Sequence, residues 1–183
     1  MSKNHYFCNI IVVLLYDIIE KKTTRRETMS KLIDIEQIVI IDDSEYKRND
    51  IHSYMRKLYP SAKIKEHSAV NPALYYVCVN LAESDADMKK VLVITDMVMP
   101  LMHGFPFDDL EREAGFNILC EFNRKNLECP VIVESSEDVD IKKAKELYKN
   151  TLGFVKESPR FYNLSKYEQL LEVDTSEQDS AEK

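Results

Sequence analysis

Short apolar runs recur along the chain, and the segments between them repeat apolar residues at helical spacing. The clearest run is Val91-Leu-Val-Ile94, which leads through Thr95 into Asp96. An apolar, mostly β-branched run bounded by turn signals is typical of a strand buried on both faces. On this basis we predict five strands, over residues 36–41, 62–67, 91–95, 130–133 and 153–156.

Amphipathic helices are predicted between and after these strands. The clearest has Ser44 as its N-cap and ends before Pro60, with apolar positions at Ile51, Tyr54, Met55 and Leu58. The other four start at Asn71, near Phe116, at Asp138 and near Leu164. Strands alternating with helices predict an α/β fold, a doubly wound five-stranded parallel sheet with right-handed crossovers and helices on both faces.

The pattern predicts one globular domain over residues 36–173, a disordered polar tail over 174–183 and an N-terminal appendage over 1–35. Within the appendage, residues 10–19 are apolar, but Asp17 interrupts them and they fall short of the ~18 residues that a membrane span needs. No small-residue cleavage site follows, which disfavours a signal peptide. The appendage is an extra helix, a segment upstream of a true start at Met29, where Met-Ser-Lys recurs, or a membrane anchor.

Composition narrows the class of protein. The net charge is −7 and no basic stripe is visible, which argues against nucleic-acid binding. Only three glycines are present, so Gly-rich phosphate loops are absent. The four cysteines form no CxxC pair, which disfavours a zinc site or a disulfide framework and favours a reducing, cytoplasmic location.

Carboxylates follow two of the predicted strands. Asp42 and Asp43 come directly after the strand over 36–41, and Asp96 follows the strand over 91–95. The carboxyl ends of parallel strands meet at one sheet edge, where ligands bind in open α/β sheets. Two carboxylates about 5 Å apart at an effective dielectric of 20 repel by on the order of 3 kcal/mol. Oxygen ligands of this kind suit Mg²⁺, which would remove that repulsion.

Two further strand ends carry polar residues, Ser135 and Lys156. The four motifs are Ile-Ile-Asp42-Asp43-Ser, Ile-Thr-Asp96-Met-Val-Met-Pro, Pro-Val-Ile-Val-Glu-Ser135-Ser and Gly-Phe-Val-Lys156. In this order, each at a strand end, the set resembles the receiver domain of two-component response regulators, over about residues 36–173. The resemblance implies the flavodoxin-like strand order 2-1-3-4-5, whose switch point lies between the first and third strands.

The resemblance also implies a metal site. Asp43 and Asp96 would bind Mg²⁺ directly, Asp42 would act through water, and the backbone carbonyl of Val98 would be a further ligand. Asp42 has a simpler alternative role as an N-cap of the first helix.

Three residues would handle the phosphoryl group. The resemblance implies that Asp96 is the phosphoacceptor, that Lys156 pairs with a phosphoryl oxygen, and that Ser135 offers its hydroxyl. Ser135 is also a candidate N-cap of the following helix. In the family, proline usually follows this lysine and an aromatic residue lies three positions before it, whereas Glu157 and Gly153 stand here.

The segment after Pro100 is about ten residues longer than is usual in the family. Its residues 105–113 are acidic and follow Asp96 closely in the sequence, so we predict that this insertion selects the partner.

The expected function is therefore that of a stand-alone, Mg²⁺-dependent receiver. It would accept a phosphoryl group on Asp96 from a histidine kinase or phosphotransfer protein and signal by protein–protein contact. It would not be an enzyme, apart from slow autodephosphorylation, and no DNA-binding output domain is expected. One alternative is a receiver-like interaction module that is not phosphorylated. Another is an Mg²⁺-dependent phosphohydrolase with an Asp nucleophile, although the haloacid-dehalogenase type needs Asp-x-Asp and here Asp42 and Asp43 are adjacent.

Overall fold

The computed structural model describes residues 32–101, 110–111, 113–136, 138–156 and 164–172. The chain divides into two compact units, Ile33–Leu171 and a second unit of residues 1–32 with 172–183. Within the second unit, Leu32 and Glu172 form an antiparallel bridge. The predictions for residues 10–19, the Met29 start, the tail and most of the 105–113 insertion lie outside the described residues and stay predictions.

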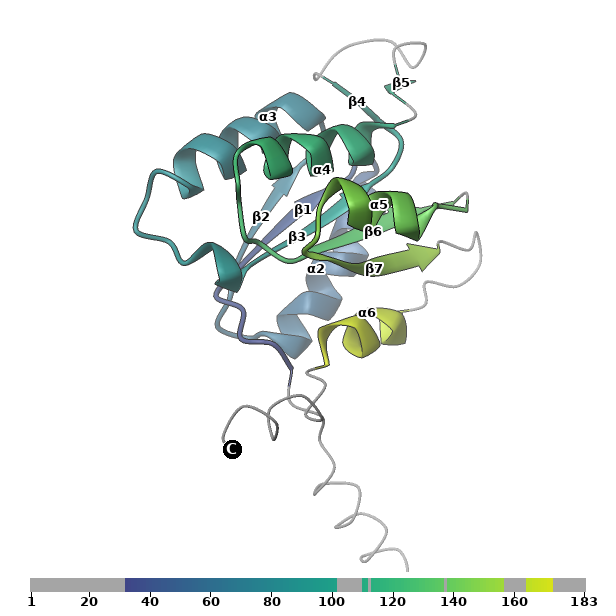
Figure 1. Ribbon diagram of the computed structural model, residues 1–183. Helices are drawn as coiled ribbons and strands as arrows, with labels where there is room; N and C mark the ends of the chain where they lie inside the picture. The colour runs from purple at the N-terminus through teal and green to yellow at the C-terminus, as the bar shows by residue number, and fades with distance from the viewer. Residues whose placement is uncertain (1–31, 102–109, 112, 137, 157–163, 173–183) are drawn as a thin grey trace, which may run out of the picture. The chain divides into compact units, whose positions relative to one another are not determined.

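A five-stranded parallel sheet forms the centre of Ile33–Leu171 (Figure 1). Its strands, in spatial order, are β2 (Lys63–His67), β1 (Gln37–Ile41), β3 (Val91–Asp96), β6 (Val131–Ser135) and β7 (Thr151–Lys156). When these five strands alone are numbered along the chain, their spatial order is 2-1-3-4-5. The predicted flavodoxin-like fold is therefore confirmed, and its switch point lies between β1 and β3.

Helices cover both faces of the sheet, as predicted. On one face lie α3 (Val70–Tyr75), α4 (Ala114–Arg124) and α5 (Ile141–Leu147), and on the other α2 (Glu45–Leu58) and α6 (Leu164–Leu171) (Figure 1). A π-helical segment, Tyr76–Leu81, continues α3, and a 3-10 turn, Met88–Lys90, precedes β3. Neither the π-helix nor the late start of α5 was predicted from the spacing of apolar residues.

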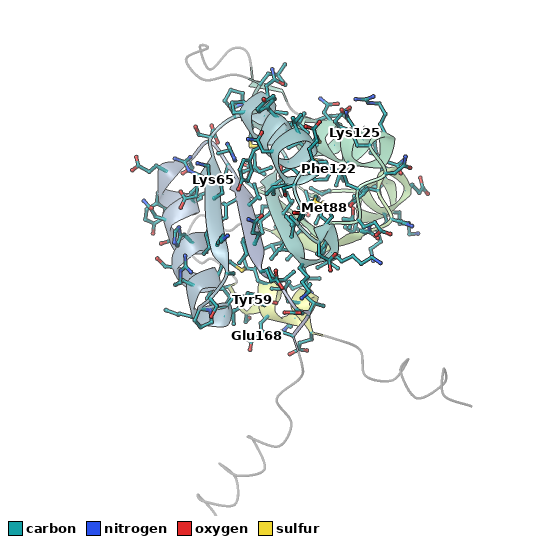
Figure 2. The ribbon with its side chains drawn as sticks, turned by 90° about the vertical axis from the view of Figure 1, so that its left-hand side faces the viewer. Tyr59, Lys65, Met88, Phe122, Lys125 and Glu168 are labelled. Carbon is teal, nitrogen blue, oxygen red and sulfur yellow. The ribbon has the colours of Figure 1, made fainter. Side chains whose placement is uncertain are left out.

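The main core lies between the sheet and the α3, α4 and α5 layer. Strand residues alternate between the two faces, so Val39 and Ile41 join this core, whereas Ile38 and Ile40 face the α2 and α6 layer. Phe122 of α4 is fully buried, whereas Lys125, just past the end of the helix, is exposed at the outside (Figure 2). The central strands thus have no polar face, as the continuous apolar runs predicted.

Two short strands lie in the segment between β3 and α4. β4 (Met99–Pro100) pairs antiparallel with β5 (Leu110–Glu111), and the sequence pattern did not predict this ribbon. It joins the start and end of the long segment that follows Asp96. Among the described residues, no helix is long and apolar enough to cross a membrane.

Candidate functional site

Three acidic side chains meet at the switch point of the sheet. In the β1–β3 register Ile41 lies beside Thr95, so the next residues, Asp42 and Asp96, come from neighbouring strand ends. One carboxylate oxygen from each of Asp42, Asp43 and Asp96 lies within 4.8 Å of the other two. The structure therefore brings together the three acids that the sequence singled out, and their chemical roles stay predictions.

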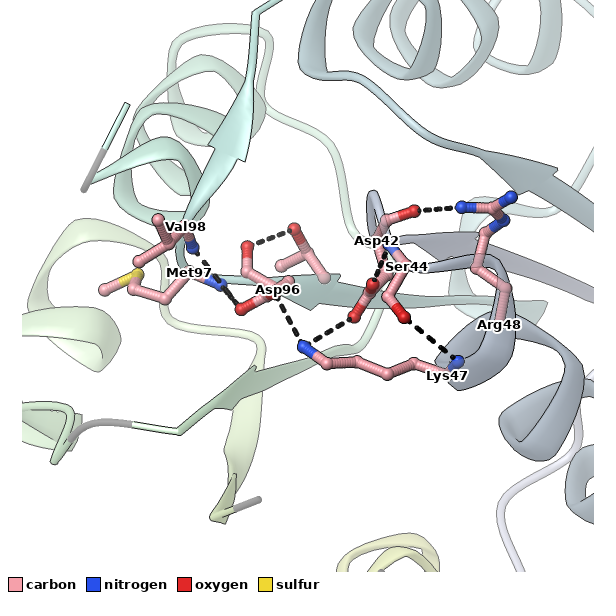
Figure 3. Close-up of polar contacts among 8 residues, drawn as sticks. Asp42, Ser44, Lys47, Arg48, Asp96, Met97 and Val98 are labelled. Carbon is pink, nitrogen blue, oxygen red and sulfur yellow. Dashed lines mark hydrogen bonds and ion pairs between the residues drawn. The ribbon is translucent and has the colours of Figure 1, made fainter. Parts of the chain in front are cut away.

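Asp96 is held firmly in place at the end of β3. Its Oδ1 accepts hydrogen bonds from the backbone N–H of Met97 at 2.6 Å and of Val98 at 3.3 Å, and its Oδ2 faces Lys47 (Figure 3). The residue is only 5% exposed. Burial raises the pKa of the Asp96 carboxyl above its usual value, and Lys47 and the two backbone donors oppose that rise.

The loop from β1 into α2 fixes Asp42. Its Oδ1 accepts the backbone N–H of Ser44 at 2.7 Å, and its carbonyl oxygen accepts the Arg48 guanidinium at 2.6 Å. Ser44 itself is the N-cap of α2, because its hydroxyl accepts the N–H of Lys47. Ser44 therefore takes the capping role that was an alternative for Asp42, and the fully buried Asp42 carboxylate faces the acidic site.

Lys47 is a member of the site that was not singled out from the sequence. Its ammonium lies 3.0 Å from Asp96 Oδ2 and 3.4 Å from Asp42 Oδ2, and so bridges the two strand ends (Figure 3). A signal for it was present in the sequence. A cation in the first turn of a helix opposes the helix dipole, and helical side chains point back toward the N-terminus. A lysine three residues after the cap and close behind Asp42-Asp43 can therefore reach those acids.

Ser135 is the buried last residue of β6. It helps to line a cavity of about 150 Å³ beside the segment that follows Asp96, and the other lining residues include Met97, Val98, Glu113, Phe116 and Asp138. Ser135 is not the N-cap of the next helix, because α5 begins after Asp140, whose carboxylate accepts the N–H groups of Lys142 and Lys143. A serine hydroxyl at this strand end is compatible with the predicted contact to a phosphoryl group.

Lys156 stands at the carboxyl end of β7, beside Ser135 in the strand register. It is half exposed, and its ammonium pairs with Asp138 at 2.5 Å. Asp138 also lines the cavity near Ser135. The structure thus places Lys156 at the predicted sheet edge but pairs it with a carboxylate of the β6–α5 connection. Glu157, which stands where the family usually has proline, lies outside the described residues.

Gly115 allows α4 to approach the site closely. A Cβ atom at this position would lie 3.1 Å from the carbonyl oxygen of Asp96, 3.2 Å from Met97 Cα and 2.8 Å from Met97 Sδ. Two of these are backbone atoms, so a side chain here would displace the segment that carries the hydrogen bonds to Asp96. Nothing in the sequence pattern marked this glycine.

The donor set fits the predicted magnesium ion. Carboxylate oxygens from three residues are hard donors of the kind that Mg²⁺ prefers, and they converge from two neighbouring strand ends. The bridging position of the Lys47 ammonium shows independently that positive charge is stabilised between Asp42 and Asp96.

Comparison with known proteins agrees with this architecture. No protein-family model and no curated protein matches the sequence. Solved structures do match. A response regulator receiver domain from Rhodospirillum rubrum is 18% identical, with a TM-score of 0.56 over 74% of this chain and 91% of its own. The signal receiver domain of an HD domain-containing protein from Pseudomonas fluorescens is 14% identical, with a TM-score of 0.53 over 75% and 91%.

A third similar structure is that of the phosphorylated cyanobacterial phytochrome response regulator RcpA. It is 17% identical, with a TM-score of 0.51 over 75% of this chain and 89% of its own. The sheet order and the acidic switch point make this chain a doubly wound α/β protein with a polar site at the carboxyl ends of its strands. Within that class it has the fold of response regulator receiver domains.

Proposed function

We propose that this protein is a receiver that accepts a phosphoryl group on Asp96 from a histidine kinase or a phosphotransfer protein. The observation that supports this most strongly is the convergence of Asp42, Asp43 and Asp96 within 4.8 Å at the switch point of a receiver fold. The similar structure of RcpA is that of a phosphorylated response regulator. A carboxylate is also a suitable covalent nucleophile toward phosphorus.

In the proposed reaction, an oxygen of Asp96 attacks the phosphorus of a phosphohistidine. The new O–P bond forms as the P–N bond breaks, and the imidazole nitrogen takes the electron pair and then a proton from solvent. The N–H groups of Met97 and Val98 orient the Asp96 carboxylate through Oδ1. The cavity at Ser135 provides space beside this segment for the transferred group. Positioning of this kind supplies much of the catalysis in phosphoryl transfer.

Asp42, Asp43 and Asp96 would hold Mg²⁺, with the Val98 carbonyl as a further ligand. When bound, the ion would neutralise the negative charge that develops on the phosphoryl oxygens. The chain's own contribution is to keep the buried Asp42 carboxylate oriented, through the N–H of Ser44. Lys156, at the same sheet edge, would have to exchange Asp138 for a phosphoryl oxygen.

Acetyl phosphate, a small-molecule phosphoryl donor, tests the proposal on the full chain. We expect intact-mass spectrometry to show a gain of one phosphoryl group when Mg²⁺ is present and no gain when EDTA removes the metal, because no ion then neutralises the charge that develops on the phosphoryl oxygens. No mass gain in saturating Mg²⁺ would contradict the proposed function, and an equal gain in EDTA would contradict its metal dependence.

A second candidate is a receiver-like interaction module that is not phosphorylated. Two observations favour it. Lys47 already neutralises part of the charge on Asp42 and Asp96, and Lys156 is paired with Asp138. The acetyl phosphate experiment separates the two, since the module would keep its mass under all conditions. The phosphohydrolase alternative would require turnover of a generic phosphomonoester, and the adjacency of Asp42 and Asp43 continues to disfavour it.

Output by protein contact completes the proposal. Phosphorylation would change the contacts of the segments next to Asp96 and Ser135, which lead into the β4–β5 ribbon and α5. A downstream protein would then recognise the altered surface. A cytoplasmic location is part of the proposal, and the cysteines Cys78, Cys120 and Cys129 are free, as a reducing compartment requires.

A further inference from the structure

Lys47 occupies the place where a bound cation would be needed. Its ammonium is 3.0 Å from Asp96 Oδ2 and 3.4 Å from Asp42 Oδ2 (Figure 3). These carboxylates are 7% and 0% exposed, whereas the lysine side chain is 21% exposed. An amine with a positive charge therefore offsets the repulsion between two buried acids without any metal.

The ammonium already contacts the carboxylates of Asp42 and Asp96, which are two of the proposed Mg²⁺ ligands. Mg²⁺ binds carboxylate oxygens at about 2.0–2.1 Å and requires near-octahedral geometry. An ion at that distance from Asp96 Oδ2 would lie at most about 5 Å from an ammonium that is 3.0 Å from the same oxygen. Like charges this close in a buried site repel strongly, so a bound ion favours departure of the ammonium.

Lys47 is also able to leave. It lies in the first turn of α2, which Ser44 caps, so its backbone is fixed while its four-carbon side chain can turn toward solvent. The Lys47 side chain is itself 21% exposed, so it borders solvent as well as the two carboxylates. Departure of the ammonium then requires no rearrangement of the sheet edge.

From this geometry we infer that Lys47 is a tethered counter-ion that competes with Mg²⁺ for Asp42 and Asp96. The inference rests on the proposed function, in that it takes the acidic site to be a magnesium site. It adds that the chain itself sets the Mg²⁺ concentration at which the site fills. At low Mg²⁺ the ammonium neutralises the two carboxylates and the site stays folded. The ion then binds only when it displaces the lysine.

The test uses the full chain with Mg²⁺ alone as the probe. Lys47→Met keeps a similar side-chain volume and removes the charge. We expect isothermal titration calorimetry to show Mg²⁺ affinity at least about tenfold higher than in the wild type, since the free energy of expelling the ammonium is no longer spent. Without metal the variant should melt at a lower temperature than the wild type, because Asp42 and Asp96 lose their counter-ion, and Mg²⁺ should raise its melting temperature more.

Two control variants make the test specific. Lys57→Met removes the same charge from an exposed position in the last turn of α2 and should leave Mg²⁺ affinity at the wild-type value. Lys47→Arg keeps the charge and should retain weak binding. Circular dichroism establishes whether each variant is folded. If Lys47→Met does not fold, Lys47→Gln is measured in its place.

The outcomes separate this inference from the proposed function. If Lys47→Met binds Mg²⁺ as the wild type does, or more weakly, competition by Lys47 is wrong, whereas the magnesium site stands. If none of the proteins binds Mg²⁺, both the inference and the metal dependence of the proposed function are overturned.

Discussion

Asp96→Asn is expected to abolish phosphorylation by acetyl phosphate completely. The amide has nearly the same shape as the carboxylate, and its oxygen can still accept the N–H groups of Met97 and Val98. It carries no negative charge, however, and cannot form the acyl phosphate, so the nucleophile is lost while the fold is kept. Intact-mass spectrometry in the presence of Mg²⁺ should show the unmodified mass alone.

The matched control is Asp85→Asn. Asp85 is an exposed residue in the turn before β3, and its replacement removes the same charge. This variant should gain one phosphoryl group as the wild type does. A mass gain that survives in Asp96→Asn would mean that another residue is the acceptor. If neither variant gained a phosphoryl group, the change in net charge would explain the result.

Phe122→Ala is expected to lower the stability of the fold severely. Phe122 is fully buried in the main core, and its ring meets Tyr148 edge to face at 5.8 Å. Removing a buried aromatic ring leaves a cavity and costs about 3–5 kcal/mol of the free energy of unfolding, a large share of the roughly 5–15 kcal/mol typical of a domain. Equilibrium unfolding in urea measures the change.

The hydroxyl of Tyr148 makes this region rigid, because it donates to the carbonyl oxygens of Cys129 at 2.7 Å and Leu127 at 3.1 Å. The ring next to Phe122 therefore cannot move freely to fill the cavity. Tyr75→Ala serves as the control, because Tyr75 is 64% exposed on α3 and its loss should change stability by only a few tenths of a kcal/mol. Similar losses in the free energy of unfolding for the two variants would contradict the burial of Phe122 in the main core.

The sheet and its acidic edge could be predicted from the sequence because both depend on local patterns. Continuous apolar runs such as Val91 to Ile94 are found where a strand is buried on both faces, and the acids that follow them fall at one sheet edge in any parallel sheet. The convergence of Asp42 and Asp96 therefore followed once the strand order 2-1-3-4-5 was in place.

Contacts that depend on side-chain direction could not be predicted in the same way. Lys47 enters the site because α2 directs its first turn back over the strand ends, and Lys156 meets Asp138 because the β6–α5 connection passes beside β7. Ser135 was a plausible helix cap only while α5 was expected to begin at 138, and α5 begins later, after Asp140. Gly115 is required by a close approach that only the packed helix reveals.

Chemical mapping of the acceptor decides whether Asp96 carries the phosphoryl group. Borohydride reduces an aspartyl phosphate to homoserine, so the protein is treated with acetyl phosphate and Mg²⁺, reduced, digested and sequenced by mass spectrometry. We expect homoserine at position 96 and unchanged aspartate at 42 and 43. Homoserine at another position, or none at all in a protein that binds Mg²⁺, would contradict the assignment of Asp96 as the phosphoacceptor.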